Sequence, residues 1–338
     1  MKATLLENTN DDLFIANTAR VSFGRWNEVL DLSLNQKGKP KDPALIDYLA
    51  KHKHQSPFYH VRFTFSFLAS NFDFTVIKDP SILMGTVFKY TNNNEVIIVR
   101  TSVYGWLNLI NNGVISNIHD ISKIYQTLAL NVPYTMIAYG LMDLNQDTEN
   151  YLDYTQNEFD PMFIDASIRI EAPIPIARQA FTHREFVSNE VSRRYVSDEP
   201  SIYIPEAYRA KPEGSIKQGS GANLTGVEEH MTSALYESTV NSSKHNYIKA
   251  LAFGLAPEQA RFMLPQAMET QFIFTGSLYS WAKLVVNRTD SHAQLEIQEL
   301  ANSIHKQLYQ KHGSVYMDGY SSAISSWESE FNKSKFKG

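Results

Sequence analysis

Residues 178–195, RQAFTHREFVSNEVSRRY, hold an unusual density of side chains that could do chemistry. Four arginines outnumber two glutamates there, whereas a surface network of ion pairs would normally alternate the two signs. Guanidinium groups bind phosphate and carboxylate oxygens through a planar fork of N–H donors, and unpaired cations are costly to bury. The stretch therefore predicts a bound anion. Its polar side chains are Arg178, Gln179, Thr182, His183, Arg184, Glu185, Ser188, Asn189, Glu190, Ser192, Arg193 and Arg194.

Two further arginines stand in segments that are predicted to be helical and apolar. Arg261 lies in PEQARFMLP, and Arg288 precedes TDSHAQLEI. A cation near the end of a helix is mildly stabilised by the helix dipole, which is the ordinary explanation for such residues. Both arginines would also gain from an anionic partner.

Three histidines occur in the segment HKHQSPFYH, at His52, His54 and His60. A His-x-His pair can begin a metal site, but no acidic ligand is near in the sequence and the chain has no cysteine, so no metal is expected. These histidines and Ser56 could instead donate hydrogen bonds to a ligand.

Composition excludes several classes of protein. With 43% hydrophobic and 20% charged residues, the chain is typical of globular proteins, and its net charge of -5 argues against a general nucleic-acid-binding surface. The absence of cysteine excludes disulfides and any mechanism with a thiolate nucleophile. The N-terminal residues lack the apolar segment of a signal peptide, and no run is long enough to span a bilayer, so we expect a cytoplasmic protein without membrane contact.

Alternating apolar residues predict strands at 61–67 and 166–172, and the second leads into the arginine-rich stretch. A helix is expected to start near Ile176 and to carry Arg178, Gln179 and Arg184 on its turns. Asp42 is the predicted N-cap of a helix that ends near His54. Other elements are expected as a strand at 96–99 and helices at 106–110, 134–142, 227–251, 277–288 and 293–308, the last with a capping box of Ser291 and Gln294.

Three segments offer no catalytic pattern. Residues 68–163 are interpreted as a structural or oligomer-contact insertion in one domain of residues 1–338, and residues 211–226 as a surface loop. The polar tail at 313–338 is assigned no role.

Four ordered blocks resemble the flavin-dependent thymidylate synthases (ThyX family). Their Arg-His-Arg signature is matched by Thr182-His183-Arg184, and the Ser-x-Asn-Glu-x-Ser-x-Arg-Tyr run by SNEVSRRY at 188–195, with ARQ upstream at 177–179. ARVSFGR at 19–25, HQSPFYH at 54–60, and EQARFMLP with RTDSHAQLEI match further family segments. The resemblance covers about two-thirds of the chain.

The resemblance implies an α+β fold, with a mixed sheet and long helices, in a homotetramer whose active sites lie between subunits. It implies methylation of dUMP to dTMP, with 5,10-methylenetetrahydrofolate as carbon donor and FAD reduced by NADPH as hydride source. Arg288 would polarise the uracil ring. The residues implied for dUMP are Gln179, Glu190, Ser192, Arg194, Arg261 and Arg288. Those implied for FAD are Ser22, Ser56, Thr182, His183, Arg184, Glu190, Ser277 and Lys283.

Several positions depart from the family pattern. Thr182 replaces the first arginine of the signature and Tyr59 the usual glutamate, while Ser277 and Lys283 stand where asparagines are common. An alternative hypothesis is therefore a flavin- and nucleotide-binding homologue that lacks synthase activity. An RNA-binding module that uses the arginine stretch is a third, and it predicts salt-sensitive binding without flavin.

Overall fold

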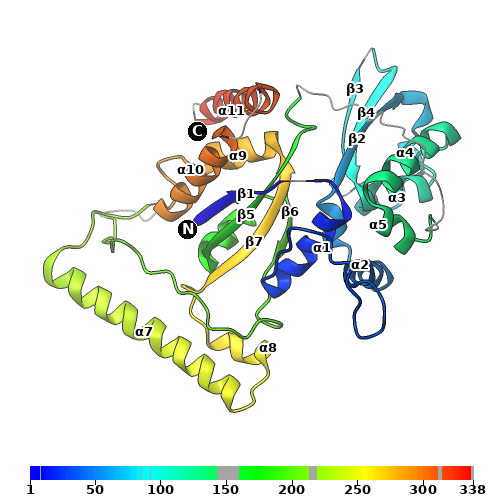
Figure 1. Cartoon of the computed structure of the whole chain (residues 1–338). Helices are drawn as coiled ribbons and strands as arrows, with labels where there is room; N and C mark the ends of the chain where they lie inside the picture. The colour runs from blue at the N-terminus through cyan, green and yellow to red at the C-terminus, as the bar shows by residue number, and fades with distance from the viewer. Residues whose placement is uncertain are drawn as a thin grey trace.

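The computed structural model describes residues 1–7, 9–83, 85–91, 93–142, 160–212, 219–310 and 314–335. Within these ranges the chain is an α+β protein, as expected, with two sheets and long helices (Figure 1). Every strand pair in both sheets is antiparallel, so the sheets are not mixed in strand direction. None of the helices in these ranges combines the length and the apolar composition needed to cross a lipid bilayer.

The first sheet has the strand order β1-β5-β7-β6 and the second has the order β2-β4-β3. The strands are β1 (Lys2–Leu5), β2 (Arg62–Leu68), β3 (Val87–Thr91), β4 (Val96–Ser102), β5 (Asp165–Pro173), β6 (Val187–Glu190) and β7 (Glu269–Ser277). The longest register joins β5 to β7, with Asp165 opposite Ser277 and Pro173 opposite Glu269. The SNE run of the arginine-rich stretch thus belongs to β6, a strand at the edge of the first sheet.

The helices of the N-terminal half are α1 (Asp12–Arg20), α2 (Lys41–Lys51), α3 (Val103–Asn111), α4 (Ile118–Asn131) and α5 (Pro133–Ala138). Those of the C-terminal half are α6 (Ile174–Ala180), α7 (Gly226–Ala252), α8 (Pro257–Ala260), α9 (Leu278–Arg288), α10 (Leu295–Gln310) and α11 (Ser314–Lys335). Short 3-10 turns are η1 (Val21–Phe23), η2 (Ser56–Tyr59), η3 (Ala69–Asn71), η4 (Phe74–Val76), η5 (Pro80–Leu83) and η6 (Arg261–Met263).

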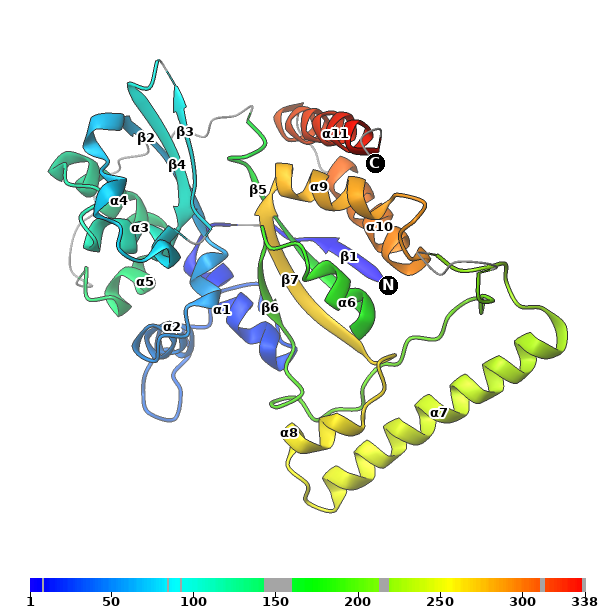
Figure 2. The same ribbon diagram turned by 180° about the vertical axis from the view of Figure 1, so that it is seen from behind.

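The first sheet carries the core that positions the candidate site. Side chains alternate between the two faces of a strand, so Ile168 and Ile170 of β5 point the same way as Phe272 and Phe274 of β7. That apolar face is covered by α6, α9 and α10, and α11 packs on the outside of α9 (Figure 2). Helices from both sides of the arginine-rich stretch therefore meet on one surface.

The second sheet forms a separate core with the N-terminal helices. Its cluster combines Phe14 of α1, Ile46 of α2 and Phe65 of β2 with Trp106 of α3 and Leu128 of α4. Residues 68–142, interpreted from the sequence as part of an insertion, thus share a core with the N-terminal segment. Residues 143–159 of that segment lie outside the described residues, and the single-domain organisation remains a prediction.

A buried ion cluster joins the two sheets. Arg62 of β2 and Arg100 of β4 both pair with the carboxylate of Asp165 at the start of β5, and the Arg62 Nη1 to Asp165 Oδ1 distance is 3.3 Å. Burial lowers the pKa of Arg100 to about 10, while Asp165 opposes that shift. Because removing one partner of a buried ion pair leaves an uncompensated charge, these residues fix how the sheets meet.

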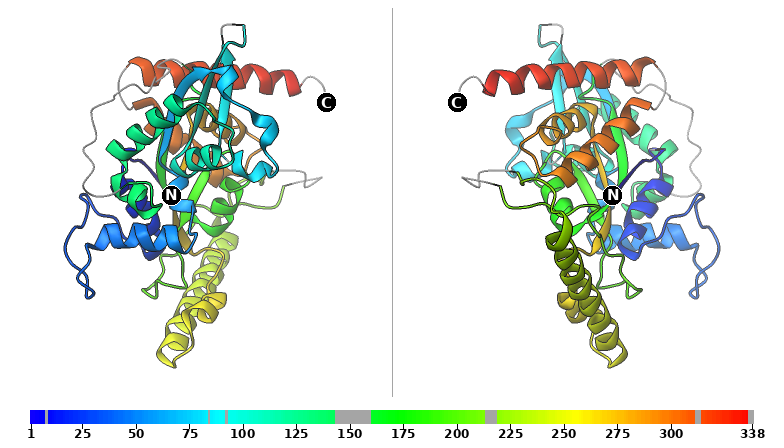
Figure 3. Two further views of the ribbon diagram at one scale, coloured as in Figure 1. Left: turned by 90° about the vertical axis from the view of Figure 1, so that its right-hand side faces the viewer. Right: turned by 90° about the vertical axis from the view of Figure 1, so that its left-hand side faces the viewer.

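Helix α7 projects from the body of the molecule (Figure 3). It is attached through a small cluster of Tyr247, Ala250 and Ala260, and through a 2.8 Å hydrogen bond from the Tyr236 hydroxyl to the carbonyl of Tyr203. The predicted helix at 227–251 is confirmed. Residues 213–218 of the loop that precedes it are outside the described residues.

Some local predictions were wrong at helix ends. Asp42 is not an N-cap but is buried in the first turn of α2, where its carboxylate pairs with Arg20 and accepts a 2.7 Å hydrogen bond from the backbone of Asp31. Arg184 is not on α6, which ends at Ala180, but lies in the turn after it. Both differences come from tertiary contacts that override local preferences.

The sequence also left elements unpredicted. Strand β7 is buried on both faces between β5 and β6, so it lacks a simple alternation of apolar and polar residues. The tail that was assigned no role contains α11, which buries Tyr320 and donates a 3.0 Å hydrogen bond from Trp327 Nε1 to the carbonyl of Tyr279 on α9. The tail residues 313 and 336–338 lie outside the described residues.

Candidate active site

The turn between α6 and β6 is held against the first sheet by Phe186. Its ring stacks on Phe274 at 5.0 Å between centroids and meets Trp281 of α9 edge-on at 4.4 Å. Gly276 makes this possible, because a Cβ atom there would lie 2.5 Å from the Phe186 ring. The turn that carries Thr182 and His183 is therefore fixed next to α9.

Arg288, the last residue of α9, reaches into this turn. Its Nε donates to His183 Nε2 at 3.0 Å, and its Nη2 donates to Thr182 Oγ1 at 2.9 Å and to the Gln179 carbonyl at 3.3 Å. Thr182 Oγ1 in turn donates to the same carbonyl at 2.7 Å. Among the described residues, Nη1 of Arg288 has no hydrogen-bond partner, so one side of the guanidinium stays available to a ligand.

His183 must be neutral to accept this hydrogen bond. Burial, and after it the positive charge of Arg288, lower its pKa from 6.5 to about 4. The imidazole is then neutral at pH 7, and its proton sits on Nδ1 because Nε2 accepts from Arg288. The histidine thus holds the arginine without adding a second positive charge.

The guanidinium of Arg288 keeps a charge that no described carboxylate neutralises. All its acceptors are neutral, and burial lowers its pKa without removing the charge of so strong a base. A half-buried, oriented cation of this kind can stabilise negative charge that develops on a bound substrate.

Gln179 connects this cluster to the start of α10. Its Nε2 donates to Gln294 Oε1 at 2.7 Å, Gln294 donates to Glu296 at 2.8 Å, and Glu296 pairs with Arg209 at 2.6 Å. The predicted capping box was wrong, because the Gln294 side chain is used in this chain of contacts. Gln294 was missed as a site residue, although its place in the TDSHAQLEI block was a signal.

A second group of predicted residues gathers near α8. Ser192 donates its backbone N–H to the Ser22 carbonyl at 3.0 Å, which joins two sequence blocks that were both assigned to the site. Arg194 Nε lies 3.6 Å from a carboxylate oxygen of Glu258, whose carbonyl accepts from Arg261 Nε at 3.3 Å. Glu258 was not singled out from the sequence, although it neighbours Arg261 in the EQARF motif.

The two groups lie in different parts of the molecule. Helix α8 lies beyond the Glu269 end of β7, where that strand begins, whereas α9 packs on the helix-covered face of the sheet (Figures 1 and 2). Glu190 of β6 points toward the helix-covered face and accepts a 2.6 Å hydrogen bond from Thr270 Oγ1. Burial raises the pKa of Glu190, and the hydrogen bond from Thr270 and the charge of Arg178 oppose that rise.

His60 and Asn189 lie on the opposite face, at the seam between the two cores. His60 is fully buried, with Nδ1 2.7 Å from Thr275 Oγ1 and Nε2 3.4 Å from Asn189 Oδ1. Asn189 Nδ2 donates to the carbonyl of Thr18 at 2.9 Å. Burial lowers the pKa of His60 to about 3, so this histidine is neutral and structural.

The remaining predicted flavin residues differ in solvent exposure and in the contacts that they already make. Ser56 and Arg184 are exposed, and no ion pair joins Arg184 to a carboxylate in the described ranges. Lys283 pairs with Glu185 and lies 5.2 Å from the ring of Trp327 in α11. Ser277 is buried, and its hydroxyl caps α9 by accepting from the Ser280 N–H at 3.1 Å.

Tyr59, which replaces a family glutamate, meets Tyr104 of α3 edge-on at 5.6 Å, and burial raises its pKa. His52 and His54 stack on Tyr48, with ring centroids 4.0 and 6.0 Å away. No group of three or more metal-ligating side chains gathers anywhere in the described parts of the chain.

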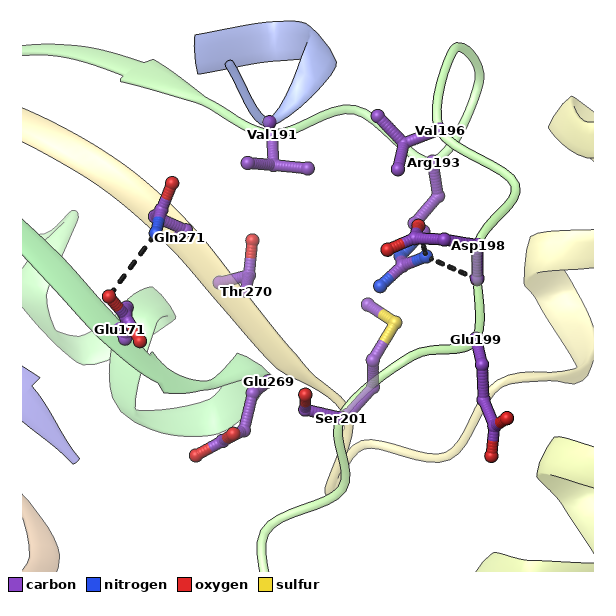
Figure 4. A pocket seen from close by; sticks show the side chains of 12 residues that line it. Glu171, Val191, Arg193, Val196, Asp198, Glu199, Ser201, Glu269, Thr270 and Gln271 are labelled. Carbon is purple, nitrogen blue, oxygen red and sulfur yellow. Dashed lines mark hydrogen bonds and ion pairs between the residues drawn. The ribbon is translucent and has the colours of Figure 1, made fainter. Parts of the chain in front are cut away.

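A pocket of about 240 Å³ opens beside the start of β7 (Figure 4). Its walls carry the carboxylates of Glu171, Asp198, Glu199 and Glu269, and its one lining arginine, Arg193, is paired with Asp198 at 2.7 Å. None of the residues that the sequence assigned to dUMP or FAD lines it. An excess of acidic groups repels a phosphate, so this pocket is not the anion site.

Comparison with known proteins gives consistent sequence matches. The family model described as "Thymidylate synthase complementing protein" (Thy1) matches residues 4–75 and 162–312. A flavin-dependent thymidylate synthase of Aquifex aeolicus is 28% identical over 310 residues, covering 87% of this chain and 92% of the relative. One from Thermosipho africanus is 36% identical over 140 residues, which are 41% of this chain and 60% of the relative.

Among solved structures, a UMP/dUMP methylase from Streptomyces cacaoi aligns with 96% of this chain and 95% of its own, at 17% identity and a TM-score of 0.43. The sequence matches are the stronger findings.

Proposed function

Because the chain belongs to the Thy1 family of thymidylate synthase complementing proteins, and flavin-dependent thymidylate synthases are among its similar relatives, we propose that it methylates dUMP to dTMP. The carbon comes from 5,10-methylenetetrahydrofolate, and the reducing equivalents come from NADPH through FAD. The observation that carries the proposal is the convergence of Gln179, Thr182 and His183 on the guanidinium of Arg288.

Arg288 is the proposed catalytic residue. The chain has no cysteine, so it cannot activate the uracil ring by thiolate attack. A fixed cation with a free Nη1 can instead bind the carbonyl edge of the ring and stabilise negative charge as the ring is attacked. Neutral His183 adds no second positive charge beside Arg288 and holds the guanidinium in one orientation.

The chemistry of the exposed and half-buried donors suits a flavin dinucleotide. Its pyrophosphate is doubly negative, and Arg184, Lys283, His183, Ser22 and Ser56 offer cationic or hydrogen-bonding groups near the turn or in the matching N-terminal blocks. When bound, the flavin supplies the hydride that the chain's own side chains cannot. The hydroxyl of Ser277 is engaged in the cap of α9, so that residue acts by orienting the helix.

We assign Gln179, Glu190 and Arg288 to one part of the dUMP site and Ser192, Arg194 and Arg261 to another. A homotetramer with active sites between subunits would unite the two groups across an interface.

An exposed stripe on α7 supports self-association, because its apolar members recur every four residues and face away from the body. They are Val227, Met231 and Leu235, each 69 to 70% exposed.

Light scattering of the wild type and of Leu235→Glu tests the assembly. A wild-type mass near four chains, and a smaller mass for the variant, are expected; a monomeric wild type contradicts the shared site.

The function is tested with the purified protein. It should show bound flavin by visible absorbance and form dTMP from dUMP only when methylenetetrahydrofolate and a reduced nicotinamide are both present, with NADPH and NADH compared side by side. Bound flavin and dUMP without turnover would favour the inactive homologue. Salt-sensitive RNA binding without flavin would favour the RNA-binding alternative.

A further inference from the structure

Thr182 occupies the position where the family signature has its first arginine, and its hydroxyl lies between α6 and the side chain of Arg288. On the basis of the proposed function, we propose that Thr182 is a positioning residue that fixes the guanidinium of Arg288 for dUMP and does not bind flavin. The sequence alone assigned Thr182 to the flavin.

The direction of the hydrogen bonds supports this role. A hydroxyl has one proton to donate, and Thr182 Oγ1 donates it to the Gln179 carbonyl at 2.7 Å. The lone pairs of this oxygen remain available to accept a hydrogen bond, and Arg288 Nη2 donates to the oxygen at 2.9 Å. The α6 carbonyl thus sets the orientation of the acceptor that Arg288 meets.

The contacts also select one edge of the guanidinium. Nε is held by His183 and Nη2 by Thr182 and Gln179, so the Nε–Nη2 edge faces the turn. Directional hydrogen bonds from two different nitrogens restrict the orientation of the planar group as well as its position. Nη1 is consequently directed away from the turn, where a ligand can meet it.

An arginine at position 182 could not do this, because a guanidinium has no acceptor and would place a second positive charge beside Arg288. Serine preserves the required hydroxyl, whereas valine preserves the shape without it. Thr182 is exposed, so neither change is expected to disturb folding.

The experiment compares Thr182→Val and Thr182→Ser with Thr289→Val as a matched control. Thr289 follows Arg288 on the chain, but its hydroxyl donates only to the Val285 carbonyl of its own helix at 2.9 Å. Measurements are kcat and KM for dUMP, dUMP affinity by calorimetry, and flavin content by absorbance.

We expect Thr182→Val to lower kcat roughly tenfold or more, as for a lost hydrogen bond to a charged group, and to weaken dUMP binding several-fold with flavin content unchanged. Thr182→Ser and Thr289→Val should stay within about twofold of the wild type. A parallel loss of flavin in Thr182→Val, or equal effects of valine and serine, would overturn the proposal.

Crystal structures of the two variants give a readout that does not depend on turnover. Arg288 should leave His183 and Gln179 in Thr182→Val and keep both contacts in Thr182→Ser; unchanged contacts in both variants would contradict the role of Thr182. If the wild type forms no dTMP, the proposed function fails, but the displacement of Arg288 still decides whether Thr182 positions it.

Discussion

His60 and His183 share a strongly lowered pKa, yet they lie in opposite kinds of environment. His60 is fully buried at the seam between the two cores, and both of its ring nitrogens meet side chains of the same seam. His183 is half-buried in a turn, and its Nε2 accepts from Arg288, whose Nη1 has no hydrogen-bond partner among the described residues.

The difference teaches that a shifted histidine pKa does not by itself mark a catalytic site. Burial is the main cause of both shifts, so the direction of the shift is the same in a structural seam and in an open corner. What separates the two places is whether a charged group nearby still has unused hydrogen-bonding capacity. Arg288 has it, whereas the cation that acts on His60 is Arg62, which is buried and paired with Asp165.

The largest effect should follow from removing the charge at the open corner. Arg288→Ala should lower kcat/KM on the order of 1,000-fold, as expected for loss of an oriented group that stabilises developing charge, while flavin stays bound. Arg288→Lys should recover only part of the activity, because lysine lacks the planar fork. Steady-state kinetics and flavin absorbance measure both; near-normal turnover by Arg288→Ala would remove it from the catalytic role.

Removing the buried histidine should affect stability instead. His60→Ala should lower the free energy of unfolding by about 3 kcal/mol, because it leaves a cavity and unpaired groups on Asn189 and Thr275. His183→Ala, at a half-buried position, should cost about 1 kcal/mol or less. Urea unfolding at pH 7 compares them, and equal losses would mean that the two histidines do not differ as described.

A nucleotide contact outside both places should give an intermediate effect. Arg194→Ala should weaken dUMP binding by about 2 kcal/mol, as for loss of a charge-assisted hydrogen bond. Arg193→Ala is the matched control, since Arg193 is already paired with Asp198. Calorimetric titration with dUMP measures both affinities. An unchanged affinity of Arg194→Ala would count against the assignment of the second group near α8.

The pH dependence of stability tests whether His60 is buried in its neutral form. The pKa of His60 is about 3 in the folded state and 6.5 when unperturbed, so its contribution is complete above pH 6.5 and is lost as the pH falls toward 3. The slope is about 1.4 kcal/mol per pH unit where only the unfolded chain holds the proton.

Asp12 acts in the opposite sense. Burial raises its pKa from 3.8 to about 6, so it adds stability as the pH falls through 6. The difference in unfolding free energy between wild type and His60→Gln cancels this common term. That difference should change with pH between 6.5 and about 3, and a flat difference would mean that His60 is not buried in its neutral form.

Much of the architecture was predictable where apolar and polar residue types alternate along a strand, even in β2, which is buried along most of its length. The alternation at 61–67 and 166–172 gave β2 and β5, and the helices at 227–251 and 277–288 were found at nearly their true ends. Strand β7 and helix α11 were not found, because β7 is buried on both faces and α11 depends on the surface of α9.

By itself the sequence determined the α+β class, the family blocks and the identity of the charged residues, because these depend on residue types and short spacings. Only the tertiary structure decided which charges act together. It placed Arg288 against Thr182 and His183, more than 100 positions earlier in the chain, and placed Arg194 with Glu258 elsewhere. The same packing makes Thr182, which stands where the family signature has an arginine, a hydrogen-bond acceptor for Arg288. Whether a hydroxyl donates or accepts depends on the neighbours that the fold places beside it.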